Sequence, residues 1–243
     1  MTSATRKIVA VGGGGFLLDD TRLLQEAYIK SQCRAEVPRV LFLGTASGDS
    51  ERAQVKFYRT FTELGCRPST LAYFPFDMRR DYAAAALESD LIYVGGGNTV
   101  AMLAVWRTFG FDEVLRQAYA AGTVLAGISA GANCWFEHYI TDSVPGGGTR
   151  SGLGILPGTF CPHLDSEVWR QPLLAQTVGV AAGAGENVCV LYENEQWCEA
   201  VQDRHSTQSN APMCQHRSAD AAPTALLVSP VVRALQASGV VKV

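Results

Sequence analysis

Short apolar runs alternate along the chain with longer segments whose apolar residues recur at helical spacing. Each run holds about five residues and is apolar on both alternating faces, which is typical of strands in a parallel sheet covered by helices on both sides. Later strands are expected within residues 153–163 and at 188–192. The first five predicted strands are KIVAV, VLFLG, LAYF, LIYVG and TVLAGIS, at residues 7–11, 40–44, 71–74, 91–95 and 123–129.

Helices are expected between these strands. The segment Ser50–Leu64 carries an apolar stripe of Phe57, Phe61 and Leu64, and Asp49 is predicted to cap it. The alternation of strands and helices predicts an α/β fold, a single domain over residues 1–243 with a doubly wound, mostly parallel sheet and helices on both faces. The other helices are predicted at residues 19–32, 81–88, 99–120 with a break at Gly110, and 167–180.

Composition narrows the class of protein. Hydrophobic residues make up 47% and charged residues 18%, which supports a large core, and a net charge of −3 does not favour nucleic acid. The seven cysteines are odd in number and form no C-x-x-C pair, so neither a disulfide framework nor a zinc site is expected. No apolar run reaches the length of a signal peptide or membrane span. These features predict a cytoplasmic protein without cofactor or metal, and an irregular surface segment over Asp203–Ala222.

The motif Gly127-Ile128-Ser129-Ala130-Gly131 matches G-x-S-x-G. An apolar strand precedes it and a helical segment follows, the context of a nucleophile elbow that exposes a serine hydroxyl above the edge of a sheet. The helix N-terminus at this point favours developing negative charge. The motif therefore predicts that Ser129 is a catalytic nucleophile, in competition with a small-residue turn that only lets a helix pack on a strand.

Two glycine turns also follow predicted strands. Gly95–Gly97 precede Asn98 and Thr99, and their amides can approach a ligand closely because glycine has no Cβ. This turn could supply one donor of an oxyanion hole, with the Ala130 amide as another. A phosphate cradle is less well supported because the P-loop lysine is missing, and a plain helix start capped by Asn98 or Thr99 is a further alternative. The function of Gly12–Gly15 stays open.

A serine nucleophile needs a base and a group that orients it. Of the four histidines, His163 stands at the end of a predicted strand, where a base can enter the site. Glu186, just before a later strand, is the favoured orienting acid, and Asp142 is the second choice. The acidic residues considered are Asp142, Asp165, Glu167, Glu186 and Glu193.

Over roughly residues 7–200 the chain resembles the peptidase E family of serine peptidases, which is related to cyanophycinase and has a fold akin to class I glutamine amidotransferases. The resemblance implies Ser129 as nucleophile, His163 as base, the amides of Gly96, Gly97 and Ala130 as oxyanion hole, and Glu186 as third triad member. It places Asn98 and Arg170 at the substrate. The segments that carry it are VGGGGF, LGTASGDSE, VGGGNT, GISAGAN and PGTFCPH.

The segment between His163 and Glu186 is shorter than in the aspartyl dipeptidases of this family, which is typical of the short subgroup. Arg170, the one basic residue in that segment, is expected on a surface helix, so we predict weak or absent activity on Asp-X dipeptides. The expected function is a dipeptidase or exopeptidase acting on small peptides through an acyl-enzyme. An amidotransferase-like or catalytically degenerate binding domain is the alternative. The expected partners are a small peptide and, in a homodimer, a second copy of the chain, with neither nucleic acid nor a membrane.

Overall fold

The computed structural model describes residues 5–18, 23–202, 214–217, 227–228 and 232–234. Its centre is a parallel sheet whose strands lie in the order β1-β5-β4-β2-β3. This order places the ends of β5 and β1 next to each other in the middle of the sheet. The strands are β1 (Lys7–Val11), β2 (Arg39–Leu43), β3 (Arg67–Leu71), β4 (Leu91–Val94) and β5 (Val124–Ile128).

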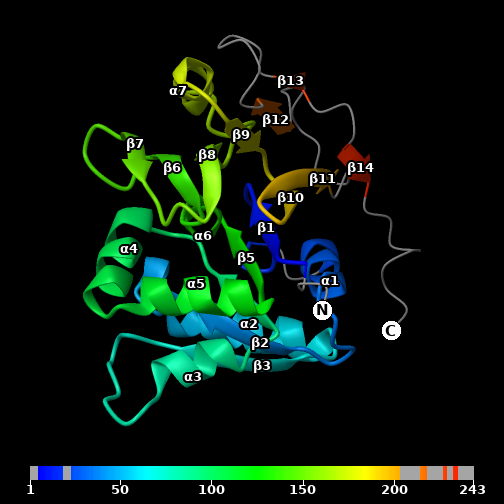
Figure 1. Ribbon diagram of the computed structural model, residues 1–243, viewed down its shortest axis with the longest axis vertical. Coiled ribbons are helices and arrows are strands. Elements are labelled where there is room, and N and C mark those ends of the chain that lie inside the picture. The colour runs from blue at the N-terminus through cyan, green and yellow to red at the C-terminus, as the bar shows by residue number, and fades with distance from the viewer. Residues whose placement is uncertain (1–4, 19–22, 203–213, 218–226, 229–231, 235–243) are drawn as a thin grey trace.

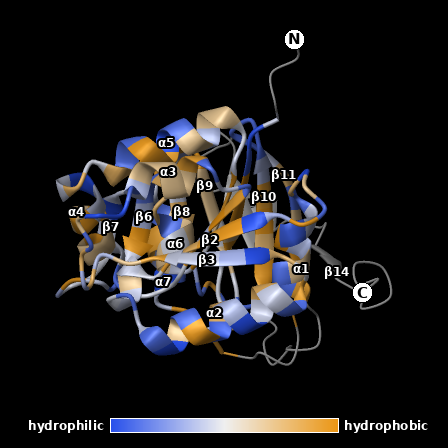
Figure 2. Ribbon diagram, turned by 90° about the horizontal axis from the view of Figure 1, so that it is seen from below, coloured by the Kyte–Doolittle hydropathy of each residue, from blue (hydrophilic) through white to orange (hydrophobic). Residues whose placement is uncertain are grey.

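Helices cover both faces of this sheet, as the alternation of strands and helices predicted (Figure 2). Alternate residues of one strand point to opposite faces, so Ile8 and Ala10 pack with α3, α4 and α5, whereas Val9 and Val11 pack with α1 and α2. Gly110, in the left-handed conformation at φ 67°, separates α4 from α5 at the predicted break. The helices are α1 (Leu24–Ser31), α2 (Glu51–Glu63), α3 (Tyr82–Leu87), α4 (Thr99–Thr108) and α5 (Phe111–Ala121).

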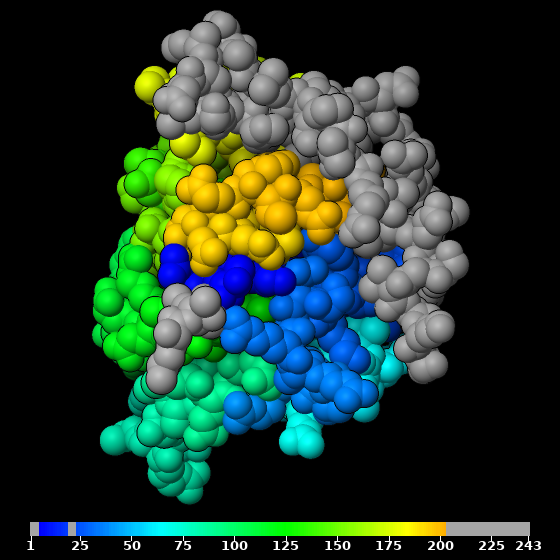
Figure 3. Space-filling model, turned by 45° about the vertical axis from the view of Figure 1, so that its right-hand side comes forward, coloured from blue at the N-terminus to red at the C-terminus, as the bar shows by residue number. Residues whose placement is uncertain are grey.

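Late strands widen the sheet on the side of β1. Strand β10 (Val188–Glu193) pairs antiparallel with β1, with Val9 opposite Leu191, and the order continues through β11 (Gln196–Gln202) to β14 (Val232–Ala234). Figure 3 shows β10 and β11 lying directly against the N-terminal segment. The turn that precedes β10 is thereby brought to the end of β1.

A second, six-stranded sheet was not predicted. Its order is β13-β12-β9-β8-β6-β7, and β6, β7 and β8 lie together beyond the end of β5 (Figure 1). Phe136 and Phe160 stack with ring centroids 4.7 Å apart, and Phe136 also meets Tyr192 of the first sheet, so one core joins the two sheets. The strands are β6 (Phe136–Thr141), β7 (Gly148–Ser151), β8 (Leu156–Cys161), β9 (Ala181–Ala184), β12 (Cys214–Arg217) and β13 (Leu227–Val228).

Several predicted boundaries were wrong. The third strand spans Arg67–Leu71 and shares only Leu71 with the predicted segment 71–74, because the carboxylate of Asp49 accepts the amides of Tyr73 and Phe74, at 2.6 and 3.0 Å. Asp49 therefore does not cap α2, whose N-cap is Ser50. The last predicted helix is shorter, α7 (Arg170–Gln176), because Thr177 already adopts an extended conformation.

The polar segment predicted to be irregular, 203–222, contains β12, and the rest of it lies outside the described residues. Two short elements remain in the described part of the chain, the 3₁₀ helix η1 (Thr45–Ser47) and the helix α6 (Ala130–Asn133). Among the helices that the structure describes, none has the length and apolar character needed to cross a membrane.

Candidate active site

Ser129 occupies a tight turn between β5 and α6. Its backbone has φ 55° and ψ −111°, a conformation that non-glycine residues rarely adopt and that persists only where the surroundings enforce it. The Ser129 amide donates to Val11 O at 3.0 Å, which fixes the turn to the end of β1. An added Cβ at Gly127 would overlap the carbonyl of Gly131, and one at Gly131 would overlap Val94 O. The two glycines of the motif thus let the helix begin directly behind the strand.

His163 and Glu186 extend from Ser129 in a hydrogen-bonded line. His163 follows β8, also with positive φ (54°), and its Nε2 lies 2.8 Å from Ser129 Oγ. Its Nδ1 lies 2.6 Å from Glu186 Oε1, in the turn between β9 and β10. The side chains of His163 and Glu186 are 19% and 27% exposed, so both are partly accessible to solvent. The structure therefore brings together the three residues that the sequence analysis proposed as a triad.

The electrostatics of this line favour an ionised acid. Burial raises the pKa of Glu186, but hydrogen bonds from His163 and Ser166, together with the charge of His163, outweigh it and leave that pKa below its ordinary value. A carboxylate at this place holds Nδ1 as the protonated ring nitrogen and leaves Nε2 free to accept the serine proton. The arrangement can therefore activate a hydroxyl nucleophile.

The other acidic candidates have different partners. Asp142 and Glu167 bind Arg170, and Glu193 lies 3.3 Å from Lys7 Nζ. Asp165, two residues after the histidine, accepts the backbone amide of Glu186 at 2.8 Å rather than the imidazole. Within the described residues, Glu186 alone among the five contacts a ring nitrogen of His163.

The glycine turn after β4 reaches the serine at Gly96. A Cβ placed on Gly96 would lie 3.4 Å from Ser129 Cβ and 3.9 Å from its Oγ, so this backbone runs beside the hydroxyl. Gly97 has φ 137°, and a Cβ there would overlap Ala46 O, so a side chain is excluded. Among the described residues, the amides of Gly96, Gly97 and Ala130 have no protein acceptor. Free amides beside a nucleophile are the arrangement that an oxyanion hole requires.

Asn98 fits the helix-start alternative. Its Oδ1 accepts the amide of Ala101 at 2.8 Å and so caps α4. Its Nδ2 donates to Ser143 O at 2.9 Å. The side chain uses its acceptor and one donor to fix the glycine turn, and its predicted contact with substrate stays a prediction.

Arg170 is not on the surface, contrary to our expectation. It is 3% exposed, and its guanidinium binds Glu167 Oε2 at 2.7 Å, Ile140 O at 2.8 Å and Asp142 Oδ1 at 3.3 Å. It also stacks over the ring of Trp169, 4.6 Å from the centroid. Burial of an arginine requires such partners, and the apolar spacing of α7 gave no sign of them. The guanidinium therefore binds protein groups at all three of its nitrogen atoms.

The positions of Gly12 and Gly13 beside the base and the acid were not predicted. The carbonyl of Gly12 accepts the His163 amide at 3.2 Å, and Gly13 forms an isolated bridge with Glu186. A Cβ on Gly13 would lie 2.5 Å from Cδ of Glu186 and 2.6 Å from its Oε1. These glycines form the surface against which the acid and the base pack. No signal in the sequence could show this, because their partners are more than 140 residues away along the chain.

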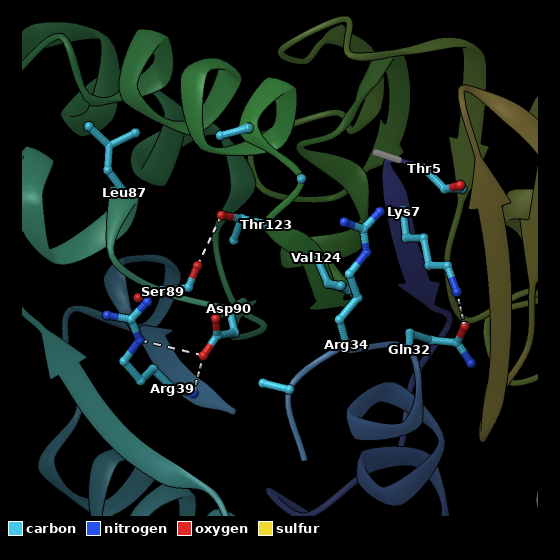
Figure 4. A pocket seen from close by; sticks show the side chains of 13 residues that line it. Thr5, Lys7, Gln32, Arg34, Arg39, Leu87, Ser89, Asp90, Thr123 and Val124 are labelled. Atoms are coloured by element: carbon cyan, nitrogen blue, oxygen red, sulfur yellow. Dashed lines mark hydrogen bonds and ion pairs between the residues drawn. The ribbon is translucent and has the colours of Figure 1, made fainter. Parts of the chain in front are cut away.

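A polar cavity of about 390 Å³ lies at the opposite edge of the sheet (Figure 4). Lys7 and Arg39, the first residues of the five-residue strands β1 and β2, line it. A strand of this length spans about 16 Å, so both residues lie about that far from the strand ends on the side of Ser129. In Figure 4 Arg34 points into it and Arg39 pairs with Asp90. The C-terminal ends of α1, α3 and α5 also face this edge, and their negative dipole ends balance the cations. The cavity is therefore separate from Ser129.

Within the described residues, no group of three His, Cys, Asp or Glu side chains is arranged to hold a metal ion.

Comparison with known proteins gives consistent matches. The model of peptidase family S51 matches residues 8–205. The uncharacterized peptidase YgaJ of Bacillus subtilis (strain 168) is 39% identical over 221 residues, which cover 88% of this chain and 96% of that protein.

Two solved structures share the fold. A peptidase from an acI-B1 Actinobacterium aligns with a TM-score of 0.60 and 17% identity over 93% of this chain and 95% of its own. A putative peptidase E protein from Listeria monocytogenes EGD-e aligns with a TM-score of 0.62 and 15% identity over 82% and 99%.

Proposed function

Because the chain belongs to peptidase family S51 and is a serine peptidase, we propose that it hydrolyses small peptides, as a dipeptidase or exopeptidase, through an acyl-enzyme at Ser129. The observation that carries this proposal is the line of hydrogen bonds from Ser129 Oγ through His163 to Glu186. A serine hydroxyl is a weak nucleophile without such a base, and a base is poorly oriented without its acid.

The chemistry follows from these atoms. His163 Nε2 takes the proton of Ser129 Oγ as the oxygen attacks the peptide carbonyl carbon, and the carbonyl oxygen becomes an oxyanion. The amides of Gly96, Gly97 and Ala130 are the donors proposed for that oxyanion. The imidazolium then gives its proton to the leaving amine, which leaves an ester on Ser129. Water, deprotonated by the same imidazole, attacks the ester carbon. The imidazolium returns the proton to Ser129 Oγ as the ester C–O bond breaks, which releases the acid product and regenerates the serine. Glu186 remains a carboxylate throughout.

Specificity for a neutral first residue is part of the proposal. Selection of an acidic side chain needs a cation whose hydrogen bonds are available to the substrate. The guanidinium of Arg170, the candidate for that role, is buried and binds Glu167, Asp142 and Ile140 O instead. We therefore expect neutral dipeptides to be cleaved faster than Asp-X dipeptides.

The test is to assay neutral and Asp-X dipeptides side by side with wild type, Ser129→Ala and Ser151→Ala. Ser151 is an exposed serine of β7 and serves as the matched control. Loss of the nucleophile should reduce kcat by about 10⁶, whereas the control should equal wild type. Peptide hydrolysis that survives in Ser129→Ala would refute the assignment. Faster turnover of Asp-X than of neutral dipeptides would refute the specificity alone.

A further inference from the structure

The turn that carries His163 also holds Glu186 at two further points. Ser166 Oγ donates to Glu186 Oε1 at 2.9 Å, the same oxygen that accepts from His163 Nδ1 at 2.6 Å. Asp165 Oδ1 accepts the backbone amide of Glu186 at 2.8 Å. Residues 163, 165 and 166 thus hold both the side chain and the main chain of the acid.

The backbone on the C-terminal side of Glu186 is held by main-chain hydrogen bonds, from Asn187 N to Gly13 O at 3.0 Å and from Val188 N to Gly185 O at 3.4 Å. Glu186 lies between the end of β9 and the start of β10, where the isolated bridge to Gly13 is the neighbouring pairing. The adjacent Gly185 presents its bare Cα to Asp165, since a Cβ there would lie 2.6 Å from the carboxyl carbon of Asp165. Asn187, on the other side, has φ 59°, which is rare for a non-glycine residue. The amide of Glu186 itself donates to Asp165, so this bond adds to the pairing with Gly13 and ties the acid to the turn that carries His163.

We propose that Asp165 and Ser166 are positioning residues, which act through Glu186 and hold it ready for His163 before substrate arrives. This inference rests on the proposed function of Ser129, His163 and Glu186. Asp165 acts as a hydrogen-bond acceptor for the main chain, and Ser166 acts as a donor that fixes the direction of the carboxylate. Base and acid then form one preassembled unit, although 23 positions separate them in the sequence.

Substitutions at Asp165 and Ser166 distinguish a positioning role from an effect of charge or a contact with substrate. If Asp165 acted through its negative charge, Asp165→Asn would slow the reaction of Ser129. If Asp165 acts only as a hydrogen-bond acceptor, Asp165→Asn should keep the rate, because the amide oxygen can accept the same hydrogen bond. Ser166 is exposed, so it could instead contact substrate. Threonine keeps the hydroxyl and so preserves the donor.

The experiment measures the rate at which a fluorophosphonate probe labels the purified full-length chain. The variants are Asp165→Ala, Asp165→Asn, Ser166→Ala and Ser166→Thr, each also made with Glu186→Ala, and thermal unfolding checks that each one folds. Asp165→Ala should slow labelling about 10- to 100-fold, because displacing a catalytic group by about 1 Å has an effect of this size. Ser166→Ala should slow it about threefold to tenfold, and Asp165→Asn and Ser166→Thr should restore rates close to wild type.

With Glu186→Ala, the alanine substitutions at 165 and 166 should have no further effect, because residues that act through one partner are not additive. Equal slowing in both backgrounds, or failure of Asp165→Asn to restore the rate, would overturn the positioning role. If Asp165→Ala does not fold, the asparagine and Ser166 variants decide alone. Absence of labelling in wild type, or labelling that survives in Ser129→Ala, would instead refute the proposed function on which the inference rests.

Discussion

Gly13→Ala is expected to disable the site by moving a single carboxylate. The added Cβ would overlap Oε2 of Glu186 and lie 2.5 Å from its Cδ, whereas ordinary contact begins at 3.4 Å, so the carboxyl group must move by at least 0.9 Å. The displaced group contains Oε1, which lies 2.6 Å from His163 Nδ1. A misplacement of about 1 Å in a catalytic group reduces rate about 10²-fold. We therefore expect Gly13→Ala to lower peptide turnover about a hundredfold.

The fold should survive this change. The clash is with the end of a side chain that can rotate away, and Gly13 has no left-handed φ that would exclude alanine. The assay is turnover of a neutral dipeptide together with thermal unfolding, in wild type, Gly13→Ala, Glu186→Ala and the double variant. The double variant should be no slower than Glu186→Ala, because both substitutions remove the same interaction. Full activity of Gly13→Ala, or a further loss in the double variant, would refute the reasoning.

Three further predictions concern stability. The pKa of Glu186 lies below its ordinary value, so its carboxylate stabilises the fold at neutral pH, and this contribution is lost as pH falls through the lowered pKa. Glu186→Gln should therefore lose less thermal stability than wild type between about pH 5 and 3. An equal loss in the two proteins would contradict this. Arg170→Ala leaves the buried carbonyl of Ile140 without its donor and should lower the free energy of unfolding by about 2 kcal/mol in urea, whereas the exposed control Arg150→Ala should change little. Asp49→Ala frees two backbone amides after β3 and should cost about 2 kcal/mol by the same measurement, and a change below about 0.5 kcal/mol would refute its role.

The central sheet could be predicted from the sequence because its strands are covered on both faces. Residues 7–11, 91–94 and 124–128 are almost wholly apolar, and burial on two sides produces that pattern. The second sheet left a weaker trace. Strand β7, GTRS, is largely exposed, and β9, AAGA, consists of small residues that fit several structures. Their strand conformation depends on pairing with β6 and β8, which local patterns do not record.

The candidate site likewise has residues that could be predicted from the sequence and residues that could not. Ser129 and His163 both follow strands that the pattern identifies, β5 and β8, so their place at strand ends could be inferred, although the two strands belong to different sheets. Glu186 was chosen by its position before a strand, and the structure places it beside the imidazole. The burial of Arg170 and the contact of Gly13 with Glu186 could not be inferred, because each depends on residues brought together by the tertiary fold.

The most direct test of the account is covalent labelling of the wild-type chain with a fluorophosphonate, followed by mass spectrometry of the intact protein and its peptides. An activated serine attacks the phosphorus and displaces fluoride, whereas an ordinary hydroxyl reacts slowly. We predict one adduct per chain, located on Ser129 and absent from Ser129→Ala, with Ser151→Ala labelled like wild type. An unlabelled wild-type chain, or an adduct that persists in Ser129→Ala, would contradict the proposal that Ser129 is the nucleophile.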